Sequence, residues 1–268
     1  MTLFVAIFAA IALWEWRSPR RRSQLRGPRW RTHVALAALN SLVVRIIAPA
    51  SGVSFALWAE QRGWGVLRHV DASAWIEATV AVVALDLVVY FQHRLLHAVP
   101  WLWRMHRTHH ADVHFDVTTG VRFHPFEIAL STLLKGGVIL LLGASPAAVL
   151  VFEIILNAGS LFSHANGSLP RGVDALLRRV IVTPDMHRVH HSIVVAEQNT
   201  NFGFNVSWWD RLFGTYRPAP AAPHESMPIG IVEWRSPDTY QITALLSDPV
   251  SPHRGLQAQA SSARPGEA

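Results

Sequence analysis

The chain has 268 residues, of which 50% are hydrophobic and only 16% are charged, and its mean hydropathy is +0.22. This balance is unusual for a soluble globular domain and predicts a membrane protein. The sequence has no cysteine, which excludes disulfides, thiolate zinc sites, iron–sulfur clusters and a cysteine nucleophile within the chain. The net charge of +6 would ordinarily suggest nucleic acid, but the basic residues lie beside apolar segments. Membrane topology explains them better, and no nucleic acid partner is expected.

The first apolar segment runs from Leu3 to Leu13 and precedes the arginine-rich run 17–31. A signal peptide has the opposite order, with its charges first. We therefore expect a short membrane segment whose cytoplasmic end lies at the arginines, although its length is below the roughly 20 residues of a perpendicular span.

Four further apolar segments follow, at about 34–58, 72–90, 126–142 and 146–162. Arg45, Pro49 and Gly52 interrupt the first of these four, and a turn at 143–146 joins the last two as a helical hairpin.

The distribution of Lys and Arg predicts the topology. If 17–31 is cytoplasmic, the segments on that side are 17–31, 93–125 and 163–217, with seven, four and six Lys or Arg, against two in 59–71 on the other side. This distribution follows the positive-inside rule. It places every histidine motif on the cytoplasmic face of an integral, multi-pass membrane protein.

We expect an all-α fold with about four to five membrane helices and a cytosolic, histidine-rich helical cap holding a di-metal site. Residues 1–71 would form the N-terminal membrane segments and basic loop, and 72–217 the catalytic domain. Residues 218–268 would form a C-terminal tail whose last dozen or so residues, rich in Pro, Ala and Ser, are expected to be disordered.

Two nearly identical motifs carry the chemistry: MHRTHH at 105–110 and MHRVHH at 186–191. On a helix, residues at i, i+3 and i+4 lie on neighbouring parts of one face. Such a motif presents at least two imidazoles to a common point, as a metal ion requires.

Similar spacing occurs in two of the apolar segments. Asp86, Tyr90, His93 and His97 share one helical face. A carboxylate at the edge of a membrane span is costly without a partner, so Asp86 is expected to hold a ligating histidine in its tautomer.

A second stripe runs through Glu153, Asn157 and His164, and His124 opens the segment at 126–142. Tyr90, Glu153 and Asn157 are predicted, with Asp86, to support the metal ligands. A role for Asp86, Glu153 and Asn157 as interhelical hydrogen-bonding groups without a link to metal stays open.

Ten histidines are therefore candidate metal ligands: His93, His97, His106, His109, His110, His124, His164, His187, His190 and His191. Because one zinc ion takes at most four protein ligands, ten candidates indicate two metals. Imidazole suits Zn, Cu, Fe and Ni alike. A lipid-facing location favours iron, because activation of O2 against a C–H bond requires a redox metal.

The chain resembles the fatty acid hydroxylase/sterol desaturase superfamily of membrane-bound di-iron oxygenases. The resemblance covers about residues 75–217 and extends more weakly to about Pro249. It is carried by DLVVYFQHRLLH, WRMHRTHH, RFHPFE, FSHANGSLP, TPDMHRVHHS and NTNFGFNVSWWDRLFGTY, in this order.

The resemblance implies a helical membrane anchor with a cytosolic cap that holds two iron ions. It carries ligand roles onto eight histidines in the three boxes and onto His164. Ser168 stands where some fatty acid hydroxylases of the superfamily have a second histidine, so the chain looks more like the sterol-desaturase-type branch. His124 or a water would then complete the coordination.

The resemblance also implies hydroxylation or desaturation of a lipid C–H bond with O2. Since no segment for flavin, haem or nicotinamide is apparent, electrons would come from a separate ferredoxin- or cytochrome b5-like protein. Arg178, Arg179 and Arg188 could dock an acidic donor or face anionic lipid.

Two other classes of function stay open from the residues. A di-zinc membrane hydrolase would need no electron donor. A metal transporter would place its ligands near the bilayer midplane, whereas these histidines lie at helix ends. The residues do not identify the lipid, which could be an acyl chain, sterol, carotenoid, alkylglycerol or sphingoid base.

Overall fold

A computed structural model describes residues 2–22, 27–235 and 237–251, and within these ranges the chain forms helices and isolated β-bridges but no strand. The long helices are α1 (Thr2–Arg17), α2 (Gly27–Ile47), α3 (Gly52–Arg62), α4 (Ala74–Ala98), α5 (Pro100–His110), α6 (Pro125–Leu142) and α7 (Pro146–Ser163). The short ones are η1 (Val66–His69), η2 (Val117–Val121), α8 (Arg171–Leu177), α9 (Pro184–His190), α10 (Val195–Gln198), α11 (Trp208–Leu212), η3 (Pro237–Tyr240), α12 (Ile242–Ser247) and η4 (Asp248–Val250). The expected all-α fold is confirmed.

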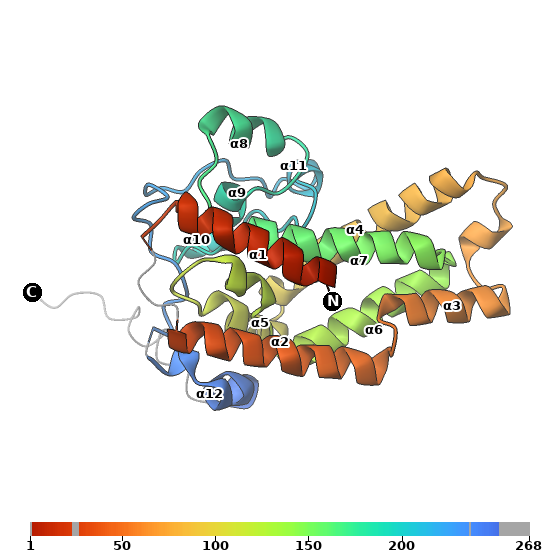
Figure 1. Cartoon of the computed structure of the whole chain (residues 1–268), viewed down its shortest axis with the longest axis horizontal. Helices are drawn as coiled ribbons and strands as arrows, with labels where there is room; N and C mark the ends of the chain where they lie inside the picture. The colour runs from red at the N-terminus through yellow and green to blue at the C-terminus, as the bar shows by residue number, and fades with distance from the viewer. Residues whose placement is uncertain (1, 23–26, 236, 252–268) are drawn as a thin grey trace, which may run out of the picture.

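Within the described ranges, four regions are long and apolar enough to cross a membrane: Gly27–His69, Ala74–Ala98, Pro125–Leu142 and Pro146–Ser163. They confirm the lower of the two expected numbers of membrane helices. Helix α1 has 16 residues and is not one of these candidates. It lies against the bundle beside α7 (Figure 1), where the ring of Trp14 stacks on that of Phe162 with centroids 6.0 Å apart.

The first candidate span is broken between α2 and α3, as Pro49 predicts. A new helix start exposes N–H groups that have no partner within the helix. Here the Glu153 carboxylate from α7 accepts hydrogen bonds from the Gly52 N–H at 2.7 Å and the Ser51 hydroxyl at 2.6 Å. Glu153 therefore satisfies the α3 N-terminus within the bundle.

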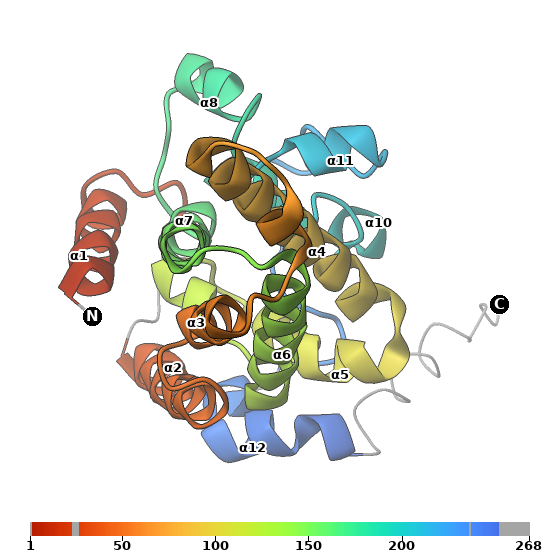
Figure 2. The ribbon, with the colours of Figure 1, turned by 90° about the vertical axis from the view of Figure 1, so that its right-hand side faces the viewer.

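The other three candidate spans are continuous helices, and the core of the bundle lies between α3, α4, α6 and α7 (Figure 2). Its fully buried side chains include Ala56, Leu85, Ile139, Val149 and Phe152. At the far end of the bundle, the turn after α6 meets the turn after α3. A Cβ at Gly65 would lie 2.0 Å from the Gly143 nitrogen, and both glycines have positive φ. Only glycine allows the two turns to approach so closely.

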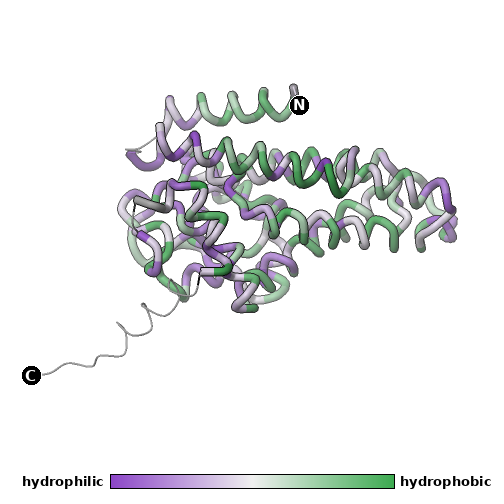
Figure 3. Tube along the Cα trace, turned by 90° about the horizontal axis from the view of Figure 1, so that it is seen from below, coloured by the Kyte–Doolittle hydropathy of each residue, from purple (hydrophilic) through white to green (hydrophobic). Residues whose placement is uncertain are grey.

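Apart from η1, which lies between α3 and α4 at the far end, the short helices gather at the opposite end of the bundle, which we call the cap. Figure 3 shows hydrophobic residues along the long helices and hydrophilic residues concentrated in the cap and at the far turns. The histidine motifs on α5 and α9 belong to the cap, as does the C-terminal end of α4 (Figure 1). The prediction that the histidine motifs meet at one end of the bundle is confirmed.

The segment after residue 217 packs onto the cap. Met227 and Ile229 are buried against Phe115, and Ile231, Trp234 and Leu245 are buried with Leu36 and Ala111. The region expected to be a tail thus contributes to the core of the cap up to η4. The last dozen or so residues, where disorder was expected, lie outside the described residues, which end at 251.

Candidate metal centre

The structure sorts nine of the ten candidate histidines into two groups, in each of which the ligand atoms lie within 4.8 Å of one another. The five-histidine group comprises His93, His97, His106, His110 and His190, and the four-histidine group comprises His109, His164, His187 and His191. Apart from the partly buried His97, these side chains are buried. Two adjacent groups of this size can hold two metal ions, with four or five nitrogens each.

Each MHR-x-HH motif serves both groups. In α5, His106 and His110 belong to the five-histidine group and His109 to the four-histidine group. In α9 and its C-cap residue His191, the division is reversed, because His187 and His191 join the four-histidine group and His190 joins the other. Successive residues of an α-helix are about 100° apart, so the i and i+4 side chains point together and the i+3 side chain diverges. The helical period therefore makes each of the two MHR-x-HH motifs contribute histidines to both groups.

Hydrogen bonds fix the tautomers of several rings. The Nδ1 atoms of His93 and His190 lie 2.8 Å from the carbonyl oxygens of Phe202 and Thr200. A carbonyl only accepts, so each Nδ1 carries the proton and donates it, which leaves a lone pair on Nε2. These Nε2 atoms are buried without a hydrogen-bond partner among the described residues, as are those of His97 and His106. Buried, unprotonated nitrogens directed at one point are suited to a metal cation.

The loop 199–202 supplies acceptors to three rings of the five-histidine group. Besides the two carbonyls, Oδ1 of Asn199 lies 3.3 Å from Nδ1 of His97. The Asp210 carboxylate accepts from the Phe202 and Gly203 N–H groups at 2.7 and 2.8 Å and so holds this loop. This contact gives the Asn-Phe-Gly and Trp-Asp segments of the sequence a structural role.

Glu127 is a functional residue that the sequence reasoning missed. Its Oε1 lies 2.9 Å from Nδ1 of His106, and both side chains are buried. The residue lies in the segment RFHPFE, where His124 drew attention instead. A carboxylate three residues beyond a histidine, at the start of an apolar helix, was the available signal.

The four-histidine group brings unprotonated nitrogens against one another. Nδ1 of His109 donates to the Arg122 carbonyl at 3.2 Å, and Nδ1 of His164 donates to the Ser160 carbonyl at 2.7 Å. Their Nε2 atoms nevertheless lie 3.1 Å apart. In the neutral rings no proton remains to bridge them, whereas two nitrogens bound to one metal at about 2.1 Å lie roughly 3.0–3.4 Å apart. The residues therefore fit a metal ion.

Burial keeps these rings neutral. It lowers the pKa of His109, His110, His187 and His191 well below the ordinary value, and neighbouring imidazoles lower it further. Burial also lowers the pKa of His164, to about 4. Neutral imidazole is the form that binds metal, so the lone pairs are available at neutral pH.

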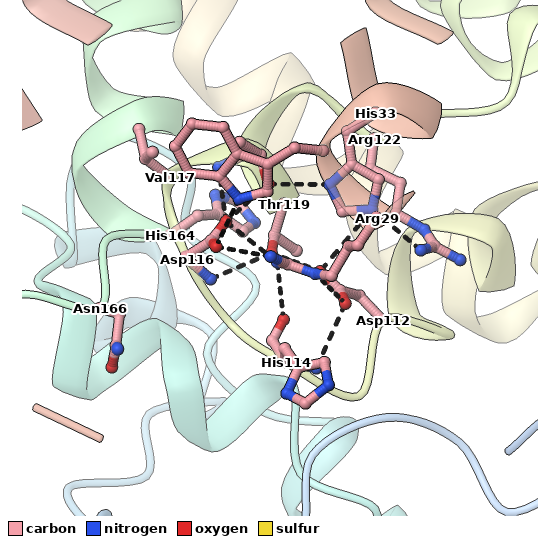
Figure 4. A network of polar contacts seen from close by, with 12 residues as sticks. Arg29, His33, Asp112, His114, Asp116, Val117, Thr119, Arg122, His164 and Asn166 are labelled. Carbon is pink, nitrogen blue, oxygen red and sulfur yellow. Dashed lines mark hydrogen bonds and ion pairs between the residues drawn. The ribbon is translucent and has the colours of Figure 1, made fainter. Parts of the chain in front are cut away.

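A buried ionic network lies beside the four-histidine group (Figure 4). The Arg29 guanidinium donates to Asp112 at 2.7 Å and to Asp116 at 2.5 and 2.9 Å. Burial alone would raise the pKa of Asp112, but the charge and hydrogen bonds of Arg29 hold it well below its usual range. Arg122, whose carbonyl orients His109, donates through its side chain to the Thr108 carbonyl at 2.7 Å. The network thus ties α2 to the segment that follows the first motif.

This network corrects the interpretation of the arginine-rich run. The arginine-rich run was interpreted only as a marker of topology, yet Arg29 is fully buried, and Arg20 pairs with Asp185 at 3.1 Å. His33, which fits no histidine motif, also belongs to the network. It is fully buried, with Nδ1 2.9 Å from the Thr118 hydroxyl and Nε2 3.0 Å from the Arg122 guanidinium.

His124 is the one candidate ligand that the structure does not bring to either group. Its Nδ1 accepts from the Phe126 N–H at 3.2 Å, and its Nε2 lies 3.3 Å from the Leu246 carbonyl. His124 is therefore the N-cap of α6.

Among the described residues, the supporting residues proposed from the sequence make their hydrogen bonds to partners other than histidine side chains. Asp86 accepts from the Asn205 amide at 2.6 Å and the Trp209 indole at 2.7 Å. It therefore anchors the segment after the loop 199–202, and its partners here are an amide and an indole, not a histidine ring.

The other three supporting residues have different partners. The Tyr90 hydroxyl lies 2.8 Å from that of Thr215, Glu153 caps α3, and the exposed Asn157 donates to the Glu153 carbonyl at 2.7 Å. Two of the three arginines suggested for docking a redox partner are also engaged. Arg188 is fully buried and pairs with Asp185, and Arg178 pairs with Asp174.

Comparison with known proteins assigns the family. The fatty acid hydroxylase family model matches residues 78–215, half of the chain, and the chain belongs to this family. Ornithine lipid hydroxylase OlsE of Rhizobium tropici is 30% identical over 225 residues, which cover 81% of this chain and 67% of that protein.

Two other relatives match a shorter region. Alkylglycerol monooxygenase of Homo sapiens is 28% identical over 51% of this chain and 29% of its own length. Cholesterol 25-hydroxylase of Rattus norvegicus is 26% identical over 53% of this chain and 47% of its own length. The matches thus span less than half the length of these two relatives. No solved structure matches. The expectation of an oxidoreductase of the lipid hydroxylase type is confirmed at the level of the family.

Proposed function

We propose that this chain is a membrane-bound di-iron monooxygenase that hydroxylates a C–H bond of a lipid, using O2 and electrons from a separate redox protein. The observation that carries the proposal is the pair of buried histidine groups, with unprotonated Nε2 atoms converging at two adjacent points. All the relatives named above are lipid hydroxylases or monooxygenases, which favours hydroxylation over desaturation.

Two iron ions, held by the five- and four-histidine groups and reduced by the external donor, would supply O2 activation and C–H cleavage. The protein's own part is to keep the proton of each histidine ring on Nδ1, so that Nε2 is free to bind a metal. The carbonyls of Phe202, Thr200, Arg122 and Ser160 retain the Nδ1 protons of His93, His190, His109 and His164. Glu127 does the same for His106 with a charged acceptor, which makes that ring a stronger donor to the metal.

The surroundings of the histidines exclude water. Phe202 packs edge-on against His93, and Phe123 stacks on His109 with ring centroids 4.5 Å apart. Phe115 covers His164 and His191. A water-poor site protects a reactive oxidant from side reactions and favours an apolar substrate.

A groove of about 360 Å3 between α5 and α6 is the proposed place of the substrate chain. It is lined by Trp101, Arg104, Met105, Phe126, Leu130 and Pro249. Met105 and Phe126 immediately precede His106 and Glu127, so the groove adjoins the five-histidine group. Its mostly apolar lining suits an acyl or similar long chain, and Arg104 at the same groove suits a polar or anionic headgroup.

A substitution tests the groove. Leu130→Trp, which fills it, should raise KM for the lipid with the metal content unchanged. Leu134→Trp, one turn along α6 and outside the groove lining, is the matched control. Equal effects of the two substitutions would contradict the assignment.

We also propose that the cap faces the cytoplasm. The segments at the cap end carry most of the Lys and Arg of the predicted loops, which favours this orientation. A ferredoxin- or cytochrome b5-like donor would then reach the histidine centre from the aqueous side of the cap.

The decisive experiment is metal analysis with oxygen consumption on the detergent-purified protein, using dithionite or a ferredoxin system as reductant. We expect about two irons per chain and reductant-dependent oxygen uptake, both reduced in His109→Ala and His190→Ala. His69→Ala, an exposed histidine at the far end of the bundle, should behave like the unmodified chain. Stoichiometric zinc without oxygen uptake would refute the oxygenase and favour a di-zinc hydrolase.

A further inference from the structure

Helix α11 packs on the membrane-spanning part of α4. The Trp209 indole donates to Asp86 at 2.7 Å, and the ring of Phe213 lies 4.9 Å from that of Phe91 and 5.4 Å from that of Tyr90. Asp86 lies about 18 Å and Phe91 about 10 Å before the end of α4, at 1.5 Å per residue. The candidate span Ala74–Ala98 includes both residues. These contacts hold α11 beside the part of α4 that enters the bilayer.

Helix α11 and the residue after it leave three large apolar side chains exposed among the described residues, beside the exposed Arg211. Leu212 is 68% and Trp208 47% exposed, and Phe213 is also exposed. Phe91 and Leu95, on the adjoining turns of α4, are exposed as well. The exposed apolar side chains of α11 are therefore continuous with a flank of α4 that the membrane covers.

The residues directly after α8 are hydrogen-bonded to α11. The Trp208 indole donates to the Arg179 carbonyl at 3.0 Å, and the Ser207 hydroxyl donates to the Arg178 carbonyl at 2.7 Å. Exposed apolar residues continue along α8 and the residues after it, with Val173, Leu176 and Val180. Exposed arginines, Arg171 and Arg179, stand among them.

We propose that the α8–α11 surface, formed by Leu176, Val180, Trp208, Leu212 and Phe213 with Arg171 and Arg179, lies in the headgroup layer of the bilayer and binds anionic lipid there. The apolar side chains enter the boundary between headgroups and acyl chains, and the arginines meet lipid phosphates. A soluble protein partner fits less well, because the surface adjoins the lipid-facing flank of α4, where the bilayer would obstruct it.

Contact with lipid would also remove the free-energy cost of exposing this apolar surface to water. Apolar area left in water costs about 25 cal/mol per Å2, and several large side chains here have no covering residues among those described. Burial in the bilayer boundary removes this cost and fixes the depth of the cap. The histidine centre would then lie at the level where membrane lipids present their chains. This inference depends on the membrane spans and not on which metal the centre holds.

The absence of cysteine from the sequence makes a direct test possible. Leu176→Cys and Leu212→Cys, each labelled with an environment-sensitive fluorophore, are reconstituted in nanodiscs with or without headgroup spin-labelled lipid. Leu141→Cys, on an exposed face of the span α6, is the lipid-contacting control. Ser226→Cys, exposed in the loop that contacts Arg21 in the cap, is the aqueous control.

We expect the labels at 176 and 212 to be quenched by the spin-labelled lipid as strongly as the label at 141, and to be shielded from aqueous iodide. Quenching should be stronger with spin-labelled phosphatidylglycerol than with phosphatidylcholine, and Arg179→Gln should reduce that preference. Labels at 176 and 212 that behave like the label at 226 would overturn the proposal and leave the surface for a protein partner. Equal quenching by both lipids would overturn the anionic preference.

Discussion

Oε1 of Glu127 on α6 lies 2.9 Å from Nδ1 of His106 on α5, with both side chains buried. Glu127 provides the only side-chain carboxylate, among the described residues, within hydrogen-bond distance of a ring in the two histidine groups. The other acceptors of Nδ1 protons in these groups, among the described residues, are uncharged carbonyl, amide or hydroxyl oxygens. The charge of Glu127 therefore distinguishes His106 from its neighbours.

Glu127→Ala should weaken metal retention at the five-histidine group by about 10–100-fold, because loss of a ligand's hydrogen-bond partner typically has this effect. Glu127→Gln keeps an oxygen acceptor but removes the negative charge. Its metal retention should therefore lie between that of the unmodified chain and that of Glu127→Ala. Chelator competition on the purified protein measures the change. Glu60→Gln, exposed on α3, is the control, and unchanged retention in Glu127→Ala would show that the contact does not tune the site.

Because each motif is divided between the two groups, substitutions of histidines in one motif should affect different metal sites. His106→Ala and His190→Ala should each lower the metal content at the five-histidine group, and His109→Ala and His164→Ala at the four-histidine group. Metal analysis with Mössbauer spectroscopy of iron-57-loaded protein should show one perturbed site in each variant, and different sites for the two pairs. The same spectrum from His106→Ala and His109→Ala would contradict the division.

The buried histidines predict a loss of stability at mildly acid pH. Burial lowers the folded-state pKa of these rings, for His164 to about 4, while the unfolded chain takes up protons near pH 6.5. Below this pH the unfolded state binds more protons than the folded state. The free energy of unfolding therefore keeps its full value above about pH 6.5 and decreases as the pH falls toward 4. The decrease is at most about 1.4 kcal/mol per pH unit for each ring.

Thermal unfolding of the metal-free protein in detergent, measured from pH 8 to pH 5, checks this expectation. The midpoint should stay constant down to about pH 6.5 and then decrease. His69→Ala should leave this profile unchanged, because His69 is exposed. A constant midpoint over the whole range would mean that the rings are protonated, or accessible to water, in the folded state.

A buried ion pair fastens the C-terminal segment to the first motif. Nε of Arg107 donates to Oδ2 of Asp248 at 2.5 Å, and a second guanidinium nitrogen donates to Oδ1 at 2.9 Å. Arg107→Ala removes the guanidinium from a fully buried carboxylate, a change that typically costs about 3–5 kcal/mol.

We expect Arg107→Ala to release the segment that contains α12 and η4, with faster proteolysis after residue 235 and a lower unfolding midpoint. The double variant Arg107→Met with Asp248→Leu should recover part of the loss, since it leaves no buried charge. Arg104→Ala, exposed on the same helix, is the matched control. Unchanged proteolysis in Arg107→Ala would show that apolar packing alone holds the segment.

The sequence by itself determined the class of fold and the chemical nature of the site. Apolar segments long enough to span a bilayer have few alternatives to helices, because every backbone group needs a partner within the segment. The spacing of the two MHR-x-HH motifs follows the helical period, which is a local property. Nine of the ten candidate ligands accordingly lie in the two histidine groups. His124 lies outside them, because a histidine before a proline also fits a helix cap.

Only the tertiary structure decided which histidines share a group and what holds each ring. Carbonyl acceptors such as those of Phe202 and Arg122 belong to the backbone and have no signature in the residue type. The partners of Asp86 and Arg29, Asn205 and Asp112, are 119 and 83 residues away in the chain. Whether a buried charge supports the metal or the fold depends on which segment the tertiary structure brings beside it, and a pattern read along one helix contains no information about that segment.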